Sequence, residues 1–224
     1  LQYFNKFLLF LVPAIIGSSF YKDYQSVSHR LLYSFPLNKQ DYILGHFFSA
    51  LFLVFLIALV VVLGLVLANF LPGLDPHKIG PFRPLAFAQS FLLFILPNML
   101  VSGLLVFAVV LRSRNIYAGF GTILVLILLQ KILENVWSQQ PYLIALTDPL
   151  GQNTIGYLTQ YWTLEERNTR LLPIDSVVLW NRLLWTSIGT LAFVLAKRWF
   201  RFHESIDTFR FLSRQDASLV SMPS

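Results

Sequence analysis

The 224-residue sequence contains no cysteine, and only 12% of its residues are charged. The lack of cysteine excludes a disulfide framework, a thiolate nucleophile and a cysteine-ligated zinc site. The low charge excludes an ordinary soluble domain, in which charged residues make up about 25% of the sequence. What the chain has instead is 56% hydrophobic residues, among them 21 Phe. These proportions indicate a membrane protein.

Long runs without charge show where the chain would cross a bilayer, because a spanning helix needs about 20 mostly apolar residues. Such runs predict an all-α integral membrane protein with five spans, at about residues 4–20, 43–70, 86–111, 116–137 and 176–196. The first run is the shortest and reaches full length only with Tyr3 and Phe4 or with residues before Leu1. We therefore expect a transmembrane domain over residues 1–201 and a tail over residues 202–224.

The basic residues are distributed unequally over the segments that join the spans. Ten lie in alternate segments: Lys22, Arg30, Lys39, Arg112, Arg114, Lys197, Arg198, Arg201, Arg210 and Arg214. The other segments hold four: Lys78, Arg83, Arg167 and Arg170. The positive-inside rule places the first set, and with it the C-terminal tail, in the cytoplasm. An odd number of spans that begins outside, in a chain that opens without Met, leads us to expect a sixth span before Leu1.

The net charge of +6 favours contact with anionic lipid headgroups rather than with nucleic acid. The first cytoplasmic segment, residues 21–41, has the spacing of an amphipathic helix, in which Tyr24, Val27, Leu31 and Leu32 recur every three or four residues. Pro36 would end that helix. The segment could be a connector that lies on the membrane surface or an element on which a cytoplasmic partner docks.

The outer segment at residues 138–175 is long enough to hold structure of its own. The aromatic residues in and just before it are typical of an interfacial belt, although a platform that recognises sugar or lipid is an alternative. They are Trp137, Tyr142, Tyr157, Tyr161 and Trp162.

Polar residues inside the spans are the remaining functional candidates, since each is costly in lipid unless it is paired or hydrated. Lys131 and Glu134 are three residues apart and can pair on one helix face. Arg182 lies about two turns inside the last span. The three charges could form a structural cluster by local pairing and snorkelling, or line the mouth of a path. Pro97 predicts a helix kink, with a gating hinge as the alternative, and Asn98 predicts a buried amide that needs a partner.

No enzyme motif is complete in this sequence. His203-Glu204 begins like the zinc-protease pattern HExxH, but Asp207 stands where the second His belongs. No P-loop, metal-ligand spacing or cofactor motif is present, so we expect no catalytic residue, metal site or cofactor. Gly119-Phe120-Gly121 is too short for a nucleotide loop, and small residues in a span favour close helix packing.

The stretch over residues 21–50, which includes LLYSFPLNKQDYILGHF, resembles the ABC-2-type permease pattern. In that family a polar cytoplasmic helix with an LLYSxPL run leads into a long hydrophobic span and couples to an ATPase. The resemblance implies a bundle of about six transmembrane helices, five of them present here, with an interfacial coupling helix. The implied coupling residues are Tyr24, Arg30, Leu31, Leu32, Tyr33 and Pro36.

A second stretch, residues 147–185, is similar to the outer loop of bacterial permeases that are fused to an M1-type aminopeptidase. The matching runs are DPLG at Asp148, where the family pattern has Phe in place of Leu150, YWTLEERNT at Tyr161, and NRLLW at Asn181. The implied outer-loop motif residues are Asp148, Tyr161, Trp162, Arg167 and Asn168. A peptidase itself would lie outside these residues.

From these resemblances we expect a multi-pass permease subunit in a bacterial inner membrane, with its tail in the cytoplasm. Its partners would be an ABC ATPase subunit, a second permease half and membrane lipids, and the ATP chemistry would belong to the ATPase. The alternative is a membrane anchor or sensor module that transports nothing and holds a fused or partner domain.

Overall fold

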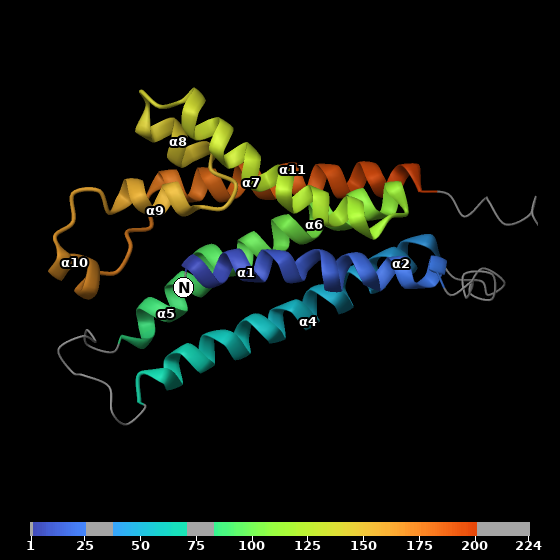
Figure 1. Ribbon diagram of the computed structural model, residues 1–224, viewed down its shortest axis with the longest axis horizontal. Helices are drawn as coiled ribbons and strands as arrows, with labels where there is room; N and C mark the ends of the chain where they lie inside the picture. Colours follow the sequence, from blue (N-terminus) through green and yellow to red (C-terminus); the bar gives the residue numbers. More distant parts are fainter. Residues whose placement is uncertain (1, 26–37, 71–82, 201–224) are drawn as a thin grey trace, which may run out of the picture.

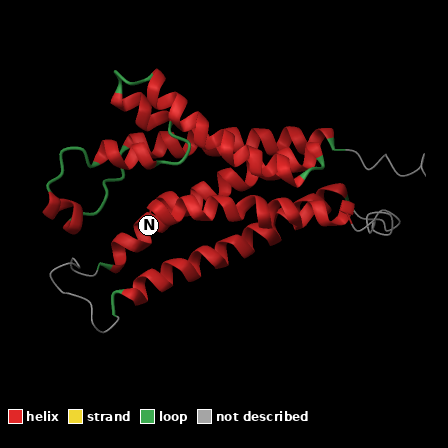
Figure 2. Cartoon of the chain, in the orientation of Figure 1, coloured by secondary structure: helices red, strands yellow, loops and turns green. Residues whose placement is uncertain are grey.

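The computed structural model describes residues 2–25, 38–70 and 83–200, and every regular element in those ranges is a helix (Figure 2). The prediction of an all-α protein is therefore confirmed. The predicted tail at 202–224 lies outside the described residues. So do the implied coupling residues Arg30, Leu31, Leu32, Tyr33 and Pro36.

Four helical stretches are long and apolar enough to cross a membrane, over Gln40–Ala68, Pro84–Ser113, Ile116–Val136 and Ser176–Trp199. The first of them belongs to α4 (Lys39–Ala68), and the third and fourth are α7 (Ile116–Val136) and α11 (Ser176–Trp199). The second joins α5 (Pro84–Ser90), the π-helical η2 (Phe91–Ile95) and α6 (Leu96–Ser113). Their ends agree with the four later predicted spans to within a few residues. By length and composition, these four stretches are consistent with an α-helical membrane protein.

The first predicted span, residues 4–20, is helical but is not one of these four stretches. It consists of α1 (Gln2–Val12), the π-helical η1 (Pro13–Gly17) and α2 (Ser18–Gln25). Asn5 and Lys6 at one end and Ser18 and Ser19 at the other shorten its apolar run. The helix nevertheless belongs to the bundle, because one face of it is buried in the core through Leu9, Val12, Ile16 and Phe20.

Close packing of these helices depends on small residues. A Cβ placed on Gly119 of α7 would lie 2.9 Å from Val110 Cγ2 of α6, and one on Gly103 of α6 would lie 2.8 Å from Ile16 Cδ1. The prediction of close helix approach is therefore confirmed at Gly119. Gly121 has open space around it.

The π-helical turn η2 ends at Ile95, two residues before Pro97. Proline lacks the N–H that would complete a hydrogen bond with the preceding turn, and a wider turn is one way to accommodate it. The predicted kink at Pro97 thus lies beside a change of helical register in η2.

Phenylalanine rings fill the core where α2, α4, α6 and α11 meet. The ring of Phe107 lies 5.8 Å from that of Phe20, 5.5 Å from Phe47 and 5.8 Å from Phe193. We call Phe20, Phe47, Phe107 and Phe193 the phenylalanine cluster. Edge-on and tilted contacts at these distances are favourable beyond simple burial.

The ends of the helices divide into two groups (Figure 1). The end of α2, the start of α4, the α6–α7 turn and the end of α11 lie at one end of the bundle. The basic residues in these segments are Lys22, Lys39, Arg112, Arg114, Lys197 and Arg198. At the opposite end lie α5 and the short helices of the loop before α11.

Candidate functional site

The predicted outer segment, residues 138–175, folds into three short helices, α8 (Pro141–Thr147), α9 (Gln152–Leu158) and α10 (Leu164–Thr169). Both α8 and α9 contact α11 and each other (Figure 1). The segment is thus anchored to the last span. The polar residues of the DPLG and NRLLW runs meet at this junction.

Asn181 of α11 closes the end of α8. Its side-chain Nδ2 donates to the carbonyl oxygens of Ala145 (3.0 Å), Leu146 (2.8 Å) and Asp148 (2.8 Å). The last carbonyls of a helix have no partner within the helix, so a side chain from elsewhere must satisfy them when they are buried. The buried amide of Asn181 in the last span therefore fixes the point at which α8 ends and the turn toward α9 begins.

Asp148 is buried in the turn between α8 and α9 and organises that turn. Its two carboxylate oxygens accept hydrogen bonds from the backbone N–H of Leu150 (3.0 Å) and of Asn153 (2.5 Å). Burial raises the pKa of the Asp148 carboxyl above its ordinary value of 3.8. The backbone donors and the nearby Arg182 guanidinium oppose that rise, because they favour the charged form.

Arg182 joins the turn to α6. Its Nη1 donates to Asn98 Oδ1 (2.5 Å), and Asn98 Nδ2 donates to the carbonyl of Leu150 (2.7 Å). The guanidinium also lies over the ring of Phe94, 5.1 Å from its centre. The predicted need of Asn98 for a partner is confirmed. Arg182 does not snorkel outward but lies inside the molecule against these groups.

Gly151 is the residue that allows Arg182 to lie there. Its φ of +72° is in the left-handed region, and a Cβ on it would lie 1.8 Å from Arg182 Nη2 and 2.9 Å from Phe94 Cδ1. Any other L-residue would therefore meet both backbone strain and overlap with the guanidinium. The glycine of DPLG and the arginine of NRLLW are complementary. We call Asn98, Asp148, Gly151, Asn181 and Arg182 the polar cluster.

Lys131 and Glu134 lie near this cluster. They pair at 2.7 Å, as their spacing predicted. The other oxygen of Glu134 accepts from Asn153 Nδ2 at 2.7 Å, and the backbone N–H of Asn153 donates to Asp148. A chain of hydrogen bonds thus connects the end of α7 to the turn that Arg182 supports, which gives the three predicted intramembrane charges a structural role.

The remaining outer-loop motif residues are arranged around α10. Thr163 and Glu166 form a reciprocal capping box at its start. The backbone N–H of Thr163 lowers the pKa of the Glu166 carboxyl. Tyr161 is 88% exposed and takes no part in the polar cluster. The side chain of Asn168 lies outside the described part of the chain, as does that of Tyr24 in α2.

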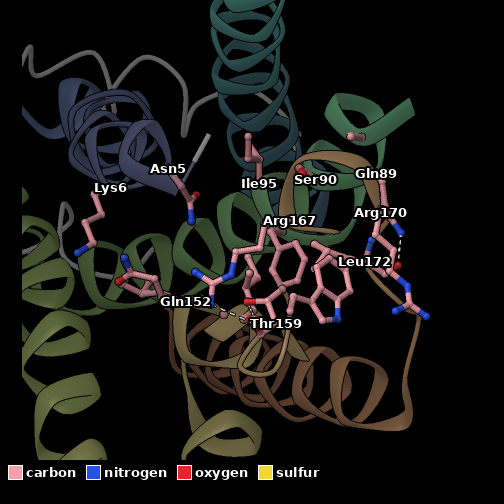
Figure 3. A pocket seen from close by; sticks show the side chains of 16 residues that line it. Asn5, Lys6, Gln89, Ser90, Ile95, Gln152, Thr159, Arg167, Arg170 and Leu172 are labelled. Atoms are coloured by element: carbon pink, nitrogen blue, oxygen red, sulfur yellow. Dashed lines mark hydrogen bonds between the residues drawn. The ribbon is translucent and has the colours of Figure 1, made fainter. Parts of the chain in front are cut away.

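Trp162 and Arg167 line a cavity of about 300 Å³ between α1, α5, η2, α9 and α10. Figure 3 shows Asn5 and Lys6 on one side of it and Gln89, Arg170 and Leu172 on the other, with Arg167 extending toward Asn5 and Gln152. Gln89 holds the backbone of Leu172 by donating to its carbonyl (2.6 Å) and accepting from its N–H (3.0 Å). Phe94, Leu150 and Gly151 form a wall behind which the Arg182 guanidinium lies.

No protein-family model, no curated protein and no solved structure matches the chain. Within residues 2–25, 38–70 and 83–200, no three His, Asp or Glu side chains gather where a metal ion could bind. The site is therefore described by its own chemistry, as a buried polar cluster beside a cavity with basic walls.

Reasoning from the sequence found Arg182, Asp148, Trp162 and Arg167 but did not connect them. It also missed the capping role of Asn181 and the contribution of Asn5 and Lys6 to the cavity. A signal was present for Asn181, because a buried amide in a span must find partners. No local signal could link Asn5 to Arg167, since the two meet only in the folded bundle.

Proposed function

We propose that the chain is the permease half of an ABC transporter, of the ABC-2 type. The observation that supports this best is the resemblance of residues 21–50 to the ABC-2 coupling pattern, together with what lies on each side of that segment. In this proposal a separate ATPase subunit docks on residues 21–41 from the cytoplasm, and the permease supplies the path through the bacterial inner membrane.

The packing at the two ends of that segment suits a coupling role. Just before it, Phe20 of α2 contacts the rings of Tyr42 in α4 (6.1 Å) and Phe107 in α6 (5.8 Å). Ser19 Oγ also donates to the carbonyl of His46 in α4 (3.4 Å). A force on the segment would therefore reach α2, α4 and, through Phe107, α6. A driven change requires that the ATPase interact differently with two arrangements of these helices.

The proposal includes a second permease half, and α4 has a surface that suits one. Its outward side chains are apolar and exposed, among them Phe48, Phe52, Val60 and Leu67. Such a face has to be covered by lipid or by another helix. The basic end of the bundle, with the α6–α7 turn, faces the cytoplasm in this arrangement, as the positive-inside rule requires.

The test is a search for an ABC ATPase subunit encoded beside this chain, followed by co-expression of the two. We expect the double substitution Arg30→Ala and Tyr33→Ala to reduce co-purification of that ATPase and its stimulated ATP turnover by about tenfold, the loss of roughly 1.4 kcal/mol of contact energy. Tyr161→Ala is the matched control, because it removes an exposed aromatic side chain at the opposite end.

Unchanged association and turnover in the double variant would contradict the docking role. Absence of any ATPase gene or co-purifying ATPase subunit would favour the alternative, a membrane anchor or sensor module that transports nothing.

A further inference from the structure

The cavity beside the polar cluster has basic walls. Lys6, Arg167 and Arg170 line it, and among the described residues that line it none is acidic. Arg170 forms an exposed pair with Glu166 at 3.4 Å and lies over the ring of Trp162, whereas Arg167 donates to the Thr159 carbonyl. These contacts hold the two guanidinium groups in place. Glu166 offsets the charge of Arg170, whereas the contact of Arg167 is to a neutral carbonyl and leaves its charge available to a ligand.

Two buried groups add to this. Asn5 is 8% exposed and lines the cavity, and its Oδ1 has no hydrogen-bond partner within the described part of the chain. Behind the wall of Phe94 and Gly151, Nε and Nη2 of Arg182 also have no hydrogen-bond partner within the described part of the chain. A buried polar atom without a partner costs free energy, so the amide of Asn5 favours a ligand that brings its own donor. The Asp148 carboxylate lies near the Arg182 guanidinium behind the wall, so the charge that favours an anion in the cavity comes from the basic residues that line it.

The remaining walls restrict the ligand further. Phe94, Ile95, Leu150 and Ile155 make one side apolar, and Gln89, Ser90 and Gln152 supply neutral polar groups. A volume of about 300 Å³ is at the small end of ligand pockets. The group that fits is compact, is anionic, carries a hydroxyl and has an apolar side.

We propose that this cavity binds a phosphate ester that carries a free hydroxyl, of the glycerol phosphate kind. The phosphate would lie between Arg167 and Lys6, and a hydroxyl of the ester would donate to Asn5 Oδ1. This chemistry is shared by the headgroup of an anionic phospholipid and by a free glycerol phosphate. The site does not rest on the proposed transport function, because it follows from the walls of the cavity alone.

The test measures binding to the full chain in two arms. In one arm, protein in a nonionic detergent is titrated with glycerol 3-phosphate by calorimetry. In the other, protein is exchanged into phosphatidylcholine nanodiscs with a minor fraction of phosphatidylglycerol, and retained phosphatidylglycerol is counted by native mass spectrometry. Saturable binding in the first arm would show that a free glycerol phosphate is enough for binding. Retention of phosphatidylglycerol without binding in the first arm would show that the ligand is the lipid.

Three variants locate the binding. Lys6→Gln combined with Arg167→Gln should weaken it by about tenfold or more, since charge-assisted hydrogen bonds to phosphate are the strong ones. Ala86→Phe leaves every basic residue in place but fills the cavity, and it should abolish binding. Arg83→Gln is the matched control, because Arg83 is an exposed arginine of the same end that donates to the Thr169 carbonyl but does not line the cavity. It should change the dissociation constant by less than about twofold, since salt screens exposed charges.

The proposal is overturned if glycerol 3-phosphate shows no saturable binding in the first arm and no phosphatidylglycerol is retained in the second. It is also overturned if Arg83→Gln weakens binding as much as the double variant does, because that result would assign the affinity to general surface charge. Should Ala86→Phe fail to fold, the double variant and its control still decide, as both change only exposed side chains.

Discussion

The two ends of the bundle are held together by different forces. At the end that carries the outer segment, the polar cluster joins α6, α11 and the α8–α9 turn through short, directed hydrogen bonds. At the opposite end, the phenylalanine cluster joins α2, α4, α6 and α11 through contacts between aromatic rings. The stability of the polar cluster depends on the angles and lengths of its hydrogen bonds, whereas that of the phenylalanine cluster depends mainly on how well the rings fill the core.

This difference has a consequence for what each end can do. A buried hydrogen-bond network allows few alternatives, since each broken bond leaves a polar group without a partner. Aromatic packing has several favourable geometries at similar ring distances. The outer end is therefore the rigid one, and the end beside residues 26–37 is better suited to small changes in helix arrangement. The following predictions test that contrast by thermal or chemical unfolding of the protein in detergent.

Gly151→Ala should give the largest effect. The new Cβ would add left-handed strain and overlap with Arg182 Nη2 and Phe94, which together cost about 2–5 kcal/mol of unfolding free energy. The control is Gly156→Ala in α9, where a Cβ would meet nothing within 4 Å. That change should be neutral or stabilise by up to about 1 kcal/mol, because Ala is the better helix former. Equal effects of the two substitutions would show that the polar cluster is not rigid.

One substitution to leucine in each cluster compares the polar cluster with the phenylalanine cluster directly. Asn181→Leu removes the donor to three carbonyls and should cost about 3 kcal/mol, since buried acceptors lose their partners. Phe107→Leu keeps an apolar side chain in the phenylalanine cluster and should cost less than about 1.5 kcal/mol. Unfolding free energies from denaturant titration measure both. A larger cost for Phe107→Leu would reverse the assignment of the rigid end.

The smallest effect should be a pH dependence that belongs to the outer end alone. Because burial raises the pKa of Asp148 in the folded state, the folded chain binds more protons than the unfolded chain between the ordinary value of 3.8 and the raised one. The stability from this group is present below the ordinary value and is lost as pH rises through the raised pKa. Melting temperature against pH should show this loss in the wild type, and Asp148→Asn should remove it. A loss that persists in the variant would assign it to another group.

Sequence reasoning could predict features that depend on neighbours along the chain. The Lys131–Glu134 pair, the close approach at Gly119 and the four long spans follow from helical spacing and composition. Asn98 was recognised as an amide in need of a partner, but Arg182 is 84 residues away, and spacing says nothing about which distant helices meet. The cavity was beyond prediction for the same reason, because its walls come from five separate elements.

The bond between Asn98 and Arg182 also imposes an order on biosynthesis. When α6 leaves the ribosome, the residue that will satisfy Asn98 has still to be translated, and the carbonyl of Leu150 comes 52 residues after Asn98. Until α11 enters the bilayer, α6 carries an amide without its final partners, and α8 is not capped by Asn181. The outer segment can take its final form only after the last span has been inserted. A chain truncated before that point would expose polar groups in lipid, a state that a membrane chaperone or protease can recognise.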